Sequence, residues 1–226
     1  MICAVLSNEP IAPGVFDLRL DMGAAGAEQK PGRFLHIAVG LTLRRPLGLC
    51  EPGRVVYAVR GEGTRRLARA KKGDLADILG PLGRGFPESD EPTLLLGGGM
   101  GAPPLLYCSR SLKSSAALLS FRGQRSVILA SDFANCDVHI GERFPAERIG
   151  SFGLRRVFAC GPRPMLAAVA KECARLGLPC FVLMEERMAC GVGACLVCAC
   201  AVTGGGYSRV CADGPVFPAE QVAWHG

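Results

Sequence analysis

The chain has 226 residues, of which 49% are hydrophobic, 20% are charged and 6% are aromatic, and its formal net charge is +6. This is the composition of a globular protein, and it excludes a disordered chain. Lysine and arginine are scattered in short pairs such as Arg44 and Arg45. A nucleic-acid-binding protein usually has a denser basic stripe, so we expect no nucleic-acid partner.

Hydropathy and cysteine usage favour a reducing compartment. The most apolar stretch, residues 93–108, is interrupted by four glycines and two prolines, and the first residues lack the pattern of a signal peptide. We therefore expect no membrane partner and a cytoplasmic location. Five of the 12 cysteines lie between Cys190 and Cys211, which favours a local metal site over a disulfide scaffold.

Residues 1–90 are predicted to be β-rich. Glycine, proline and charged residues separate short apolar runs, which is typical of an antiparallel barrel or sandwich. Residues 23–32 are expected to form a hairpin-like excursion, and residues 64–70 a helix with Thr64 as its N-cap. The expected strands cover residues 2–6, 15–20, 34–39, 55–59 and 74–79.

Residues 91–184 change to an alternation of strands and helices. A polar stretch at residues 88–92 precedes the change and is typical of a linker. The alternation predicts a parallel α/β sheet, and residues 185–226 follow as a cysteine-rich and turn-rich segment. The expected strands cover residues 93–96, 116–121, 156–159 and 179–184, with helices from residue 104 and over residues 165–176.

Two glycine-containing turns in this α/β region could bind a nucleotide. Gly97, Gly99 and Ala102 have the spacing of a turn that lets a pyrophosphate approach the amide groups of a following helix. A simple packing turn would explain the pattern as well, and the acidic residue usual about twenty positions further on is missing. Residues 160–162 end a later strand at the edge where such folds bind ligands.

A second phosphate cradle is expected in the β-rich region. Arg44 and Arg45 could bind a diphosphate together with the start of the helix that follows Gly61. Solvated arginines and a capped helix are the alternative explanation for these residues.

The cysteines of the C-terminal segment carry the most specific signal. Cys190, Cys195 and Cys198 have the spacing C-x4-C-x2-C, and Cys211 follows; this is the plant-type [2Fe–2S] pattern. Structural zinc is an alternative, although zinc sites more often use paired C-x2-C motifs. Cys200 is a fifth thiol of the segment and could replace a ligand, while the other seven cysteines are most simply core residues.

With these motifs in order, nearly the whole chain resembles the electron-transfer subunits of the two-subunit, NAD-linked dihydroorotate dehydrogenases, in the ferredoxin–NADP reductase superfamily. The most distinctive stretches are residues 184–195 and 211–217. The resemblance implies a flavin-binding β-barrel at 1–90, an NAD-binding α/β domain at 91–184 and a [2Fe–2S] domain at 185–226. It implies that Cys190, Cys195, Cys198 and Cys211 ligate the iron ions.

The resemblance also implies two nucleotide cofactors. FAD is expected at Arg45, Pro46, Leu47, Gly48, Val56, Tyr57, Ala58, Gly63 and Thr64. NAD is expected at Gly97, Gly98, Gly99, Gly101, Cys160, Gly161 and Pro162. Arg122 and Arg125 could instead favour the 2′-phosphate of NADP. No residue of this chain is expected to be catalytic in its own right, because the cofactors carry the redox chemistry.

Three departures from the family pattern are visible. Gly48 stands where the family has serine, which removes a hydroxyl contact near the flavin, although a backbone N–H could replace it. Ala58 stands where the family usually has arginine. The stretch between Val127 and Phe152 is shorter than usual, and the glycine-rich loop D-G-S-x-G-x-x-G is not recognisable.

The implied function is electron transfer for pyrimidine biosynthesis. A catalytic subunit containing FMN would oxidise dihydroorotate, and electrons would pass through the [2Fe–2S] cluster and FAD to NAD⁺, in a heterotetramer with two copies of each subunit. One alternative is a reductase with the same cofactors that serves a different oxidoreductase partner. The other is a non-enzymatic binding module held together by zinc.

Overall fold

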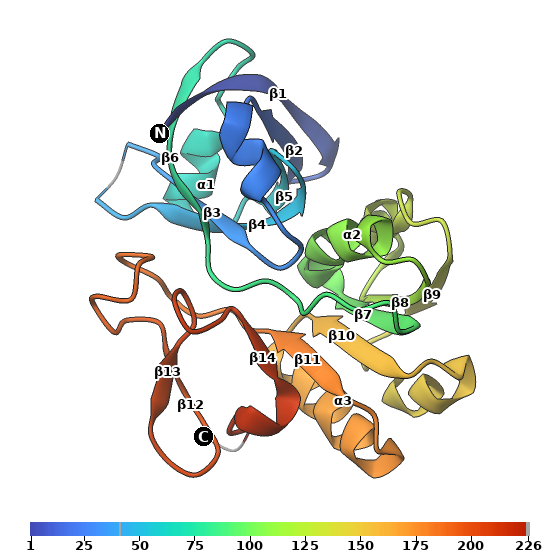
Figure 1. The fold of residues 1–226 in the computed structure, drawn as a ribbon. Coiled ribbons are helices and arrows are strands. Elements are labelled where there is room, and N and C mark those ends of the chain that lie inside the picture. Colours follow the sequence, from blue (N-terminus) through green and yellow to red (C-terminus); the bar gives the residue numbers. More distant parts are fainter. Residues whose placement is uncertain (41, 225–226) are drawn as a thin grey trace.

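The first part of the chain closes into a barrel, in a computed structural model that describes residues 1–40 and 42–224. Its six antiparallel strands follow the order β1-β2-β5-β4-β3-β6 (Figure 1). The expected barrel is thereby confirmed. The strands are β1 (Ile2–Ala12), β2 (Val15–Leu20), β3 (Phe34–Ile37), β4 (Arg45–Glu51), β5 (Arg54–Ala58) and β6 (Leu75–Leu82).

Strand β3 is buried on both faces. Because side chains alternate along a strand, Leu35 and Ile37 point into the barrel core, and Phe34 and His36 point outward. All four side chains are nevertheless buried. The outer face of β3 is therefore covered by the rest of the molecule, and the functional site lies on this side of the barrel.

Strand β4 and the start of helix α1 (Glu62–Leu67) differ from the sequence-based expectation. Strand β4 contains Pro46 and Gly48, which usually argue against a strand, but its residues 45–48 pair with β3. The helix begins two residues before Thr64, and Gly61 is the N-cap. The Thr64 hydroxyl accepts hydrogen bonds from the N–H groups of Arg60 and Gly61 (2.9 and 3.2 Å), so it caps the helix from inside the first turn.

Residues 23–32 contain a 3-10 helix, η1 (Gly23–Glu28), in place of the expected hairpin-like excursion.

A six-stranded sheet of order β14-β11-β10-β7-β8-β9 follows the barrel. Five strands are parallel, and β14 is antiparallel to β11. Helix α2 (Ala102–Ser111) packs with Leu95 on one face, and α3 (Arg163–Leu176) packs with Leu94 and Leu96 on the other. The strands are β7 (Thr93–Gly98), β8 (Ser115–Phe121), β9 (Cys136–Ile140), β10 (Arg156–Cys160), β11 (Cys180–Leu183) and β14 (Val216–Pro218).

Two connections of this sheet are short. The segments between β8 and β9 and between β9 and β10 form the 3-10 helices η3 (Gln124–Ala130) and η4 (Ala146–Phe152). Both lie in or beside the stretch between Val127 and Phe152, which is shorter in this chain than in the family that the sequence resembles. Strand β9 was not predicted because its residues are half-buried or exposed at the sheet edge.

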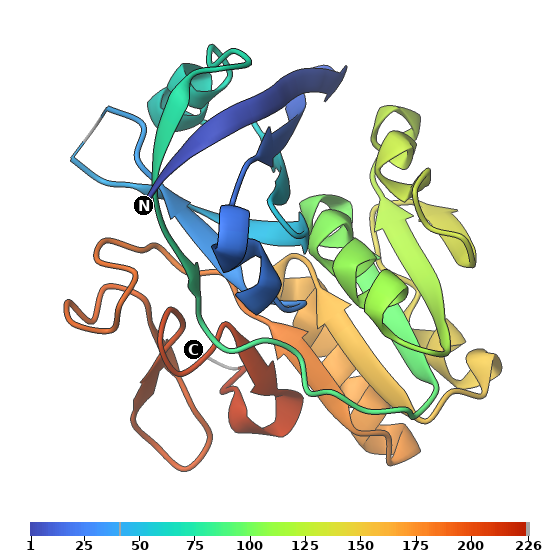
Figure 2. The ribbon, with the colours of Figure 1, turned by 45° about the horizontal axis from the view of Figure 1, so that its top comes forward.

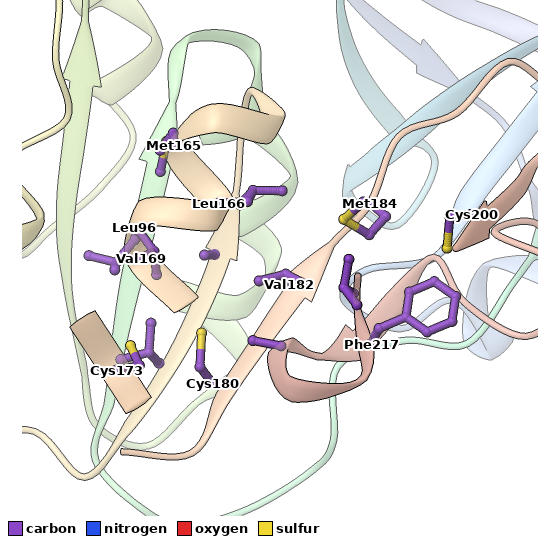
Figure 3. Close-up of a cluster of buried hydrophobic side chains, with 14 of the residues drawn as sticks. Leu96, Met165, Leu166, Val169, Cys173, Cys180, Val182, Met184, Cys200 and Phe217 are labelled. Atoms are coloured by element: carbon purple, nitrogen blue, oxygen red, sulfur yellow. The ribbon is translucent and has the colours of Figure 1, made fainter. Parts of the chain in front are cut away.

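The cysteine-rich segment lies beside both the barrel and the sheet (Figures 1 and 2). It contains a small hairpin of β12 (Ala199–Ala201) and β13 (Tyr207–Arg209), and the 3-10 helix η5 (Ala219–Gln221) follows β14. One hydrophobic core extends from Val169 on α3 across β11 to Phe217 and Cys200 (Figure 3). This shared core fixes the segment against the sheet.

Within residues 1–40 and 42–224, no helix is long and apolar enough to cross a membrane.

Candidate functional site

The four cysteines of the predicted cluster motif form two thiol pairs. The Sγ atoms of Cys198 and Cys211 are 3.2 Å apart, and both side chains are buried. Cys190 is half-buried and Cys195 is exposed. The N–H groups of Val192 and Cys195, together with the Cys195 thiol, lower the pKa of Cys190 to about 6, so this sulfur is stabilised as a thiolate. One pair thus lies inside and the other at the surface.

Backbone N–H groups of the loop point at these sulfur atoms. The N–H of Val192 donates to the Sγ of Cys190 (3.4 Å), and the N–H of Gly193 donates to the Sγ of Cys211 (3.2 Å). The N–H of Cys211 donates to the Sγ of Cys198 (3.4 Å). Such N–H···S contacts stabilise the negative charge of thiolates that bind iron.

An ion pair braces the cluster loop. Arg209 donates through Nε and Nη2 to the carboxylate of Asp213 (2.9 Å each) and through Nη1 to the carbonyl of Gly193 (3.2 Å). The hydrogen bonds from Arg209 hold the pKa of Asp213 at about 2, so its carboxylate stays charged. Arg209 thereby ties the loop that carries the first three thiols to the turn that carries Cys211.

Two pairs of thiols suit a binuclear cluster, in which each iron takes two thiolates. A structural zinc ion takes four ligands around one centre. Cys200 is buried in the hydrophobic core that also contains Phe217 (Figure 3).

A pocket of about 370 Å³ opens between the barrel, the sheet and the cysteine-rich segment. Eight of the nine residues expected to bind FAD line it, and they come from β4, β5 and α1. The ninth, Gly63, lies against the guanidinium of Arg45, where an added Cβ would collide with it. The eight lining residues are Arg45, Pro46, Leu47, Gly48, Val56, Tyr57, Ala58 and Thr64.

The residues of the opposite wall of this pocket were not predicted. Phe34 and Arg60 contribute from the barrel, Met100 from the turn after β7, and Pro104 from the first turn of α2. Residues 183–186 and 188 contribute from the end of β11 and the chain that leads to the cluster loop. Residues 184–188 belong to a stretch with a distinctive family pattern, which is the signal that could have placed them here. Met188 lines the pocket only two residues before Cys190.

The seven residues expected to bind NAD lie together at the carboxyl edge of the sheet. The strand order reverses between the neighbouring strands β7 and β10, which is the usual ligand-binding position of such sheets. Gly97 and Gly98 are the last two residues of β7, Gly99 follows it, and Cys160 ends β10. An added Cβ on Gly98 would meet Met165 and Pro162, and one on Gly101 would collide with the carbonyl of Cys160. Glycine is therefore required for this close approach.

The two arginines that could favour NADP lie after β8, with Arg122 directly behind the strand and Arg125 in η3. Arg122 follows the strand and lies 3.8 Å from Glu142, with both side chains more than 80% exposed. Solvent screens such a pair, so the guanidinium is available at the surface.

Solved structures resemble the whole chain. A chain from the NADH-dependent reduced ferredoxin-NADP oxidoreductase, described in the context of flavin-based electron bifurcation, superposes with a TM-score of 0.89 at 26% identity, covering 99% of this chain and 90% of that one. A ferredoxin NADP⁺ reductase from Neisseria gonorrhoeae with bound FAD and NADP has a TM-score of 0.61 at 13% identity, covering 83% and 94%. The second likeness concerns the fold alone.

Sequence comparisons give the family. A family model described as the iron-sulfur cluster binding domain of dihydroorotate dehydrogenase B matches residues 185–223. The electron transfer subunit of dihydroorotate dehydrogenase B (NAD(+)) from Geobacillus thermodenitrificans is 36% identical, with 96% of each chain covered. The subunit from Caldanaerobacter subterraneus subsp. tengcongensis is 37% identical, with 98% of each chain covered. The chain belongs to the family of dihydroorotate dehydrogenase B (NAD(+)) electron transfer subunits.

Proposed function

We propose that this chain transfers electrons between a catalytic dihydroorotate dehydrogenase subunit and NAD⁺, as an oxidoreductase subunit of pyrimidine biosynthesis. The observation that carries the proposal is the succession of two sites along one short segment. Met188 lines the pocket that holds the expected flavin residues, and Cys190, the first thiol of the cluster motif, follows two residues later. Carriers held so close together can exchange electrons inside one subunit.

The four thiols are proposed to bind a [2Fe–2S] cluster as two pairs, Cys190 with Cys195 and Cys198 with Cys211. The donor set suits this group, because three backbone N–H groups already point at the sulfur atoms. The exposed position of Cys195 would leave one side of the cluster close to the surface, where a partner subunit can reach it. Cys198 and Cys211 would anchor the other side in the protein core.

The pocket between the three parts is proposed to hold FAD, and the edge formed by β7 and β10 to hold NAD. Arg45 supplies positive charge for a diphosphate, and the strands β4 and β5 supply apolar walls for a flavin ring. Met100 of the turn after β7 and Pro104 of the first turn of α2 line this pocket, so the two sites adjoin. When bound, the cluster carries single electrons and FAD converts them into the two-electron hydride chemistry of NAD.

The first test is an absorption spectrum of protein purified without oxygen, followed by titration with NADH. We expect flavin bands on top of a broad iron–sulfur absorption, and we expect NADH to bleach both. A colourless protein that contains zinc would contradict the proposal. Flavin and cluster absorption that NADH leaves unchanged would contradict the assignment of NAD as the electron acceptor.

The partner requires a separate test. We propose an FMN-containing catalytic subunit in a heterotetramer with two copies of each chain. Mixing the purified chain with that subunit, dihydroorotate and NAD⁺ should give NADH formation, and the complex should have the mass of a heterotetramer. Neither chain alone should support the reaction.

A second candidate function keeps the same carriers but has a different partner. This candidate is supported by the likeness to a chain of the NADH-dependent reduced ferredoxin-NADP oxidoreductase, which has a TM-score of 0.89. Failure of the dihydroorotate assay, combined with reduction of the chain's flavin by NADH and re-oxidation by a ferredoxin, would support this alternative.

We further propose that the protein works in the cytoplasm and that its three functional parts have boundaries near residues 90 and 184. All 12 cysteines are free, which suits a reducing compartment. The boundary at residue 184 lies next to the end of β11, although β14 returns to pair with that strand. Limited proteolysis should cleave first near residues 88–92 if this stretch is a linker.

A further inference from the structure

His36 is a buried histidine at the junction between the barrel and the cluster loop. It lies on the outward face of β3, where it pairs with Pro46 of β4 and Leu79 of β6. Its side chain is completely buried. None of the residues expected to bind a nucleotide is His36.

Neither ring nitrogen of His36 has a hydrogen-bond partner among residues 1–40 and 42–224. A buried polar group without a partner costs about 1–3 kcal/mol, so such groups usually have a partner when the protein is in its working state. An imidazole carries at least one N–H in either protonation state, which makes His36 a hydrogen-bond donor.

The ring of His36 lies directly against the cluster loop. A Cβ added to Gly191 would be 2.5 Å from the Nδ1 atom of His36, so only glycine leaves room for the ring at this point. Gly191 is the residue after Cys190 and has a positive φ of 73°. On its other side, the ring is edge-to-face with Phe34, at 6.5 Å between centroids, and Phe34 lines the flavin pocket.

We propose that His36 donates a hydrogen bond through Nδ1 to a sulfur atom of the [2Fe–2S] cluster at its Cys190 edge and thereby raises the reduction potential of the cluster. This inference rests on the proposed function, since it requires that the loop binds the cluster. His36 is a positioning and tuning residue in this proposal. It is the barrel's contribution to a site whose ligands all come from the C-terminal segment.

The direction of the effect follows from charge. Reduction adds one negative charge to the cluster, and a hydrogen bond to its sulfur stabilises the more negative state more strongly. Loss of the donor should therefore make the cluster harder to reduce. We expect the ratio of reduced to oxidised cluster at a fixed potential to fall about tenfold, which for one electron equals about 59 mV.

The test is a redox titration of the cluster in the full chain, followed by electron paramagnetic resonance of the reduced state. His36→Leu removes the donor and should lower the midpoint potential, whereas His36→Asn places an amide N–H near the position of Nδ1 and should restore most of the shift. His139→Leu is the matched control, because His139 lies on β9 and its Nδ1 interacts with Ser120. Equal potentials in the wild type and His36→Leu would overturn the proposal.

A second measurement decides the proposal even if the variants do not load a cluster. The chain has three histidines, so wild-type protein labelled with ¹⁵N-histidine can be examined by pulsed resonance methods. We expect a weak ¹⁵N coupling to the reduced cluster, and His139→Leu should retain it. Absence of the coupling in a protein with full iron and sulfide content overturns the role of His36 only. Absence of the cluster itself overturns the proposed function.

Discussion

Cys195 is the exposed member of the four proposed iron ligands, whereas Cys200 lies in the core five residues further along the chain. The Cys195→Ser protein should lose iron and acid-labile sulfide, because a cluster with three thiolate ligands binds at least about tenfold more weakly. Chemical analysis of iron and sulfide measures this. Cys200→Ala is the matched control and should keep a full cluster. A full complement of both elements in Cys195→Ser would show that the ligand assignment is wrong.

Asp213 should protect the cluster in a pH-dependent way. Its pKa is lowered to about 2 by the hydrogen bonds from Arg209, against about 3.9 for an unperturbed aspartate. A depressed folded-state pKa stabilises the fold above the unfolded pKa, and this contribution disappears as the pH falls from about 4 to about 2. The ion pair is therefore complete at neutral pH.

The Asp213→Asn protein should lose its cluster about two- to fivefold faster than the wild type at neutral pH, which is the expected range for a partly exposed ion pair. Bleaching of the visible absorption measures these rates. In the chain without iron, Asp213→Asn should also lower the free energy of unfolding at neutral pH, and this difference should shrink as the pH falls from about 4 to about 2, because the wild-type carboxylate is then protonated. Chemical denaturation measures the unfolding free energies. Glu172→Gln breaks a comparable ion pair on α3 and should not change the bleaching rate. A difference in unfolding free energy that does not depend on pH would contradict this role for Asp213.

The turn after β7 should affect the reaction with NADH, because it packs closely against the end of β10. An added methyl group on Gly101 would collide with the carbonyl of Cys160, which is backbone and can yield only if the two strands separate. Overpacking of this kind costs about 1–3 kcal/mol, so Gly101→Ala should slow the reduction of the flavin by NADH about tenfold or more. Stopped-flow absorbance measures this rate. Flavin and cluster content should stay unchanged.

Gly123→Ala is the control for the turn variant, because Gly123 follows β8 and has open space around it. This variant should be reduced at the wild-type rate. If Gly101→Ala also reacts at the wild-type rate, NAD does not bind at the edge formed by β7 and β10.

The elements show which features the sequence could predict. Strands β2, β3, β5, β8, β10 and β11 and the helix α3 were predicted close to their observed bounds, whereas β1 extends to Ala12, well beyond the expected residues 2–6. Strand β4 was missed because its stability comes from pairing with β3, which outweighs the unfavourable proline and glycine within it. Strand β9 was missed because an exposed edge strand lacks a clear apolar pattern. The local hydropathy pattern therefore predicts a strand or helix only where the burial of its side chains, and not its pairing with another strand, determines where it forms.

The residues of the candidate functional site, too, could be predicted only in part from the sequence. The thiols and one wall of the flavin pocket were predictable, because each comes from a short continuous motif. The opposite wall combines Phe34, Met100 and Met188, which are separated by many residues and have no common pattern. His36 was not singled out at all, since its importance arises from its contact with a loop more than 150 positions away. Tertiary packing creates these features.

At the scale of the whole molecule, electron transfer requires that the barrel and the nucleotide-binding sheet keep a fixed relative position. Arg54 of β5 is buried at the boundary between them, with a side chain 9% exposed. It forms ion pairs with Asp17 and Glu51 of the barrel (2.8 Å each) and with Asp132, which follows η3 of the sheet region (2.9 Å). Asp132 thus links this ion-pair group across the boundary, and Arg110 of α2 makes a second link by pairing with Glu51.

Asp132→Asn should weaken the crossing contact and leave the barrel intact, because Arg54 keeps its two barrel carboxylates and remains neutralised. We expect about 1 kcal/mol of lost stabilisation between the two parts, with faster hydrogen exchange of β5 and η3 at the boundary. Reduction of the flavin by NADH should slow about fivefold, while flavin and cluster content stay constant. Asp137→Asn is the control, since it breaks an exposed pair with Arg148 inside the sheet region. Equal exchange and equal rates in both variants would show that the Arg54–Asp132 ion pair does not help to hold the two parts together.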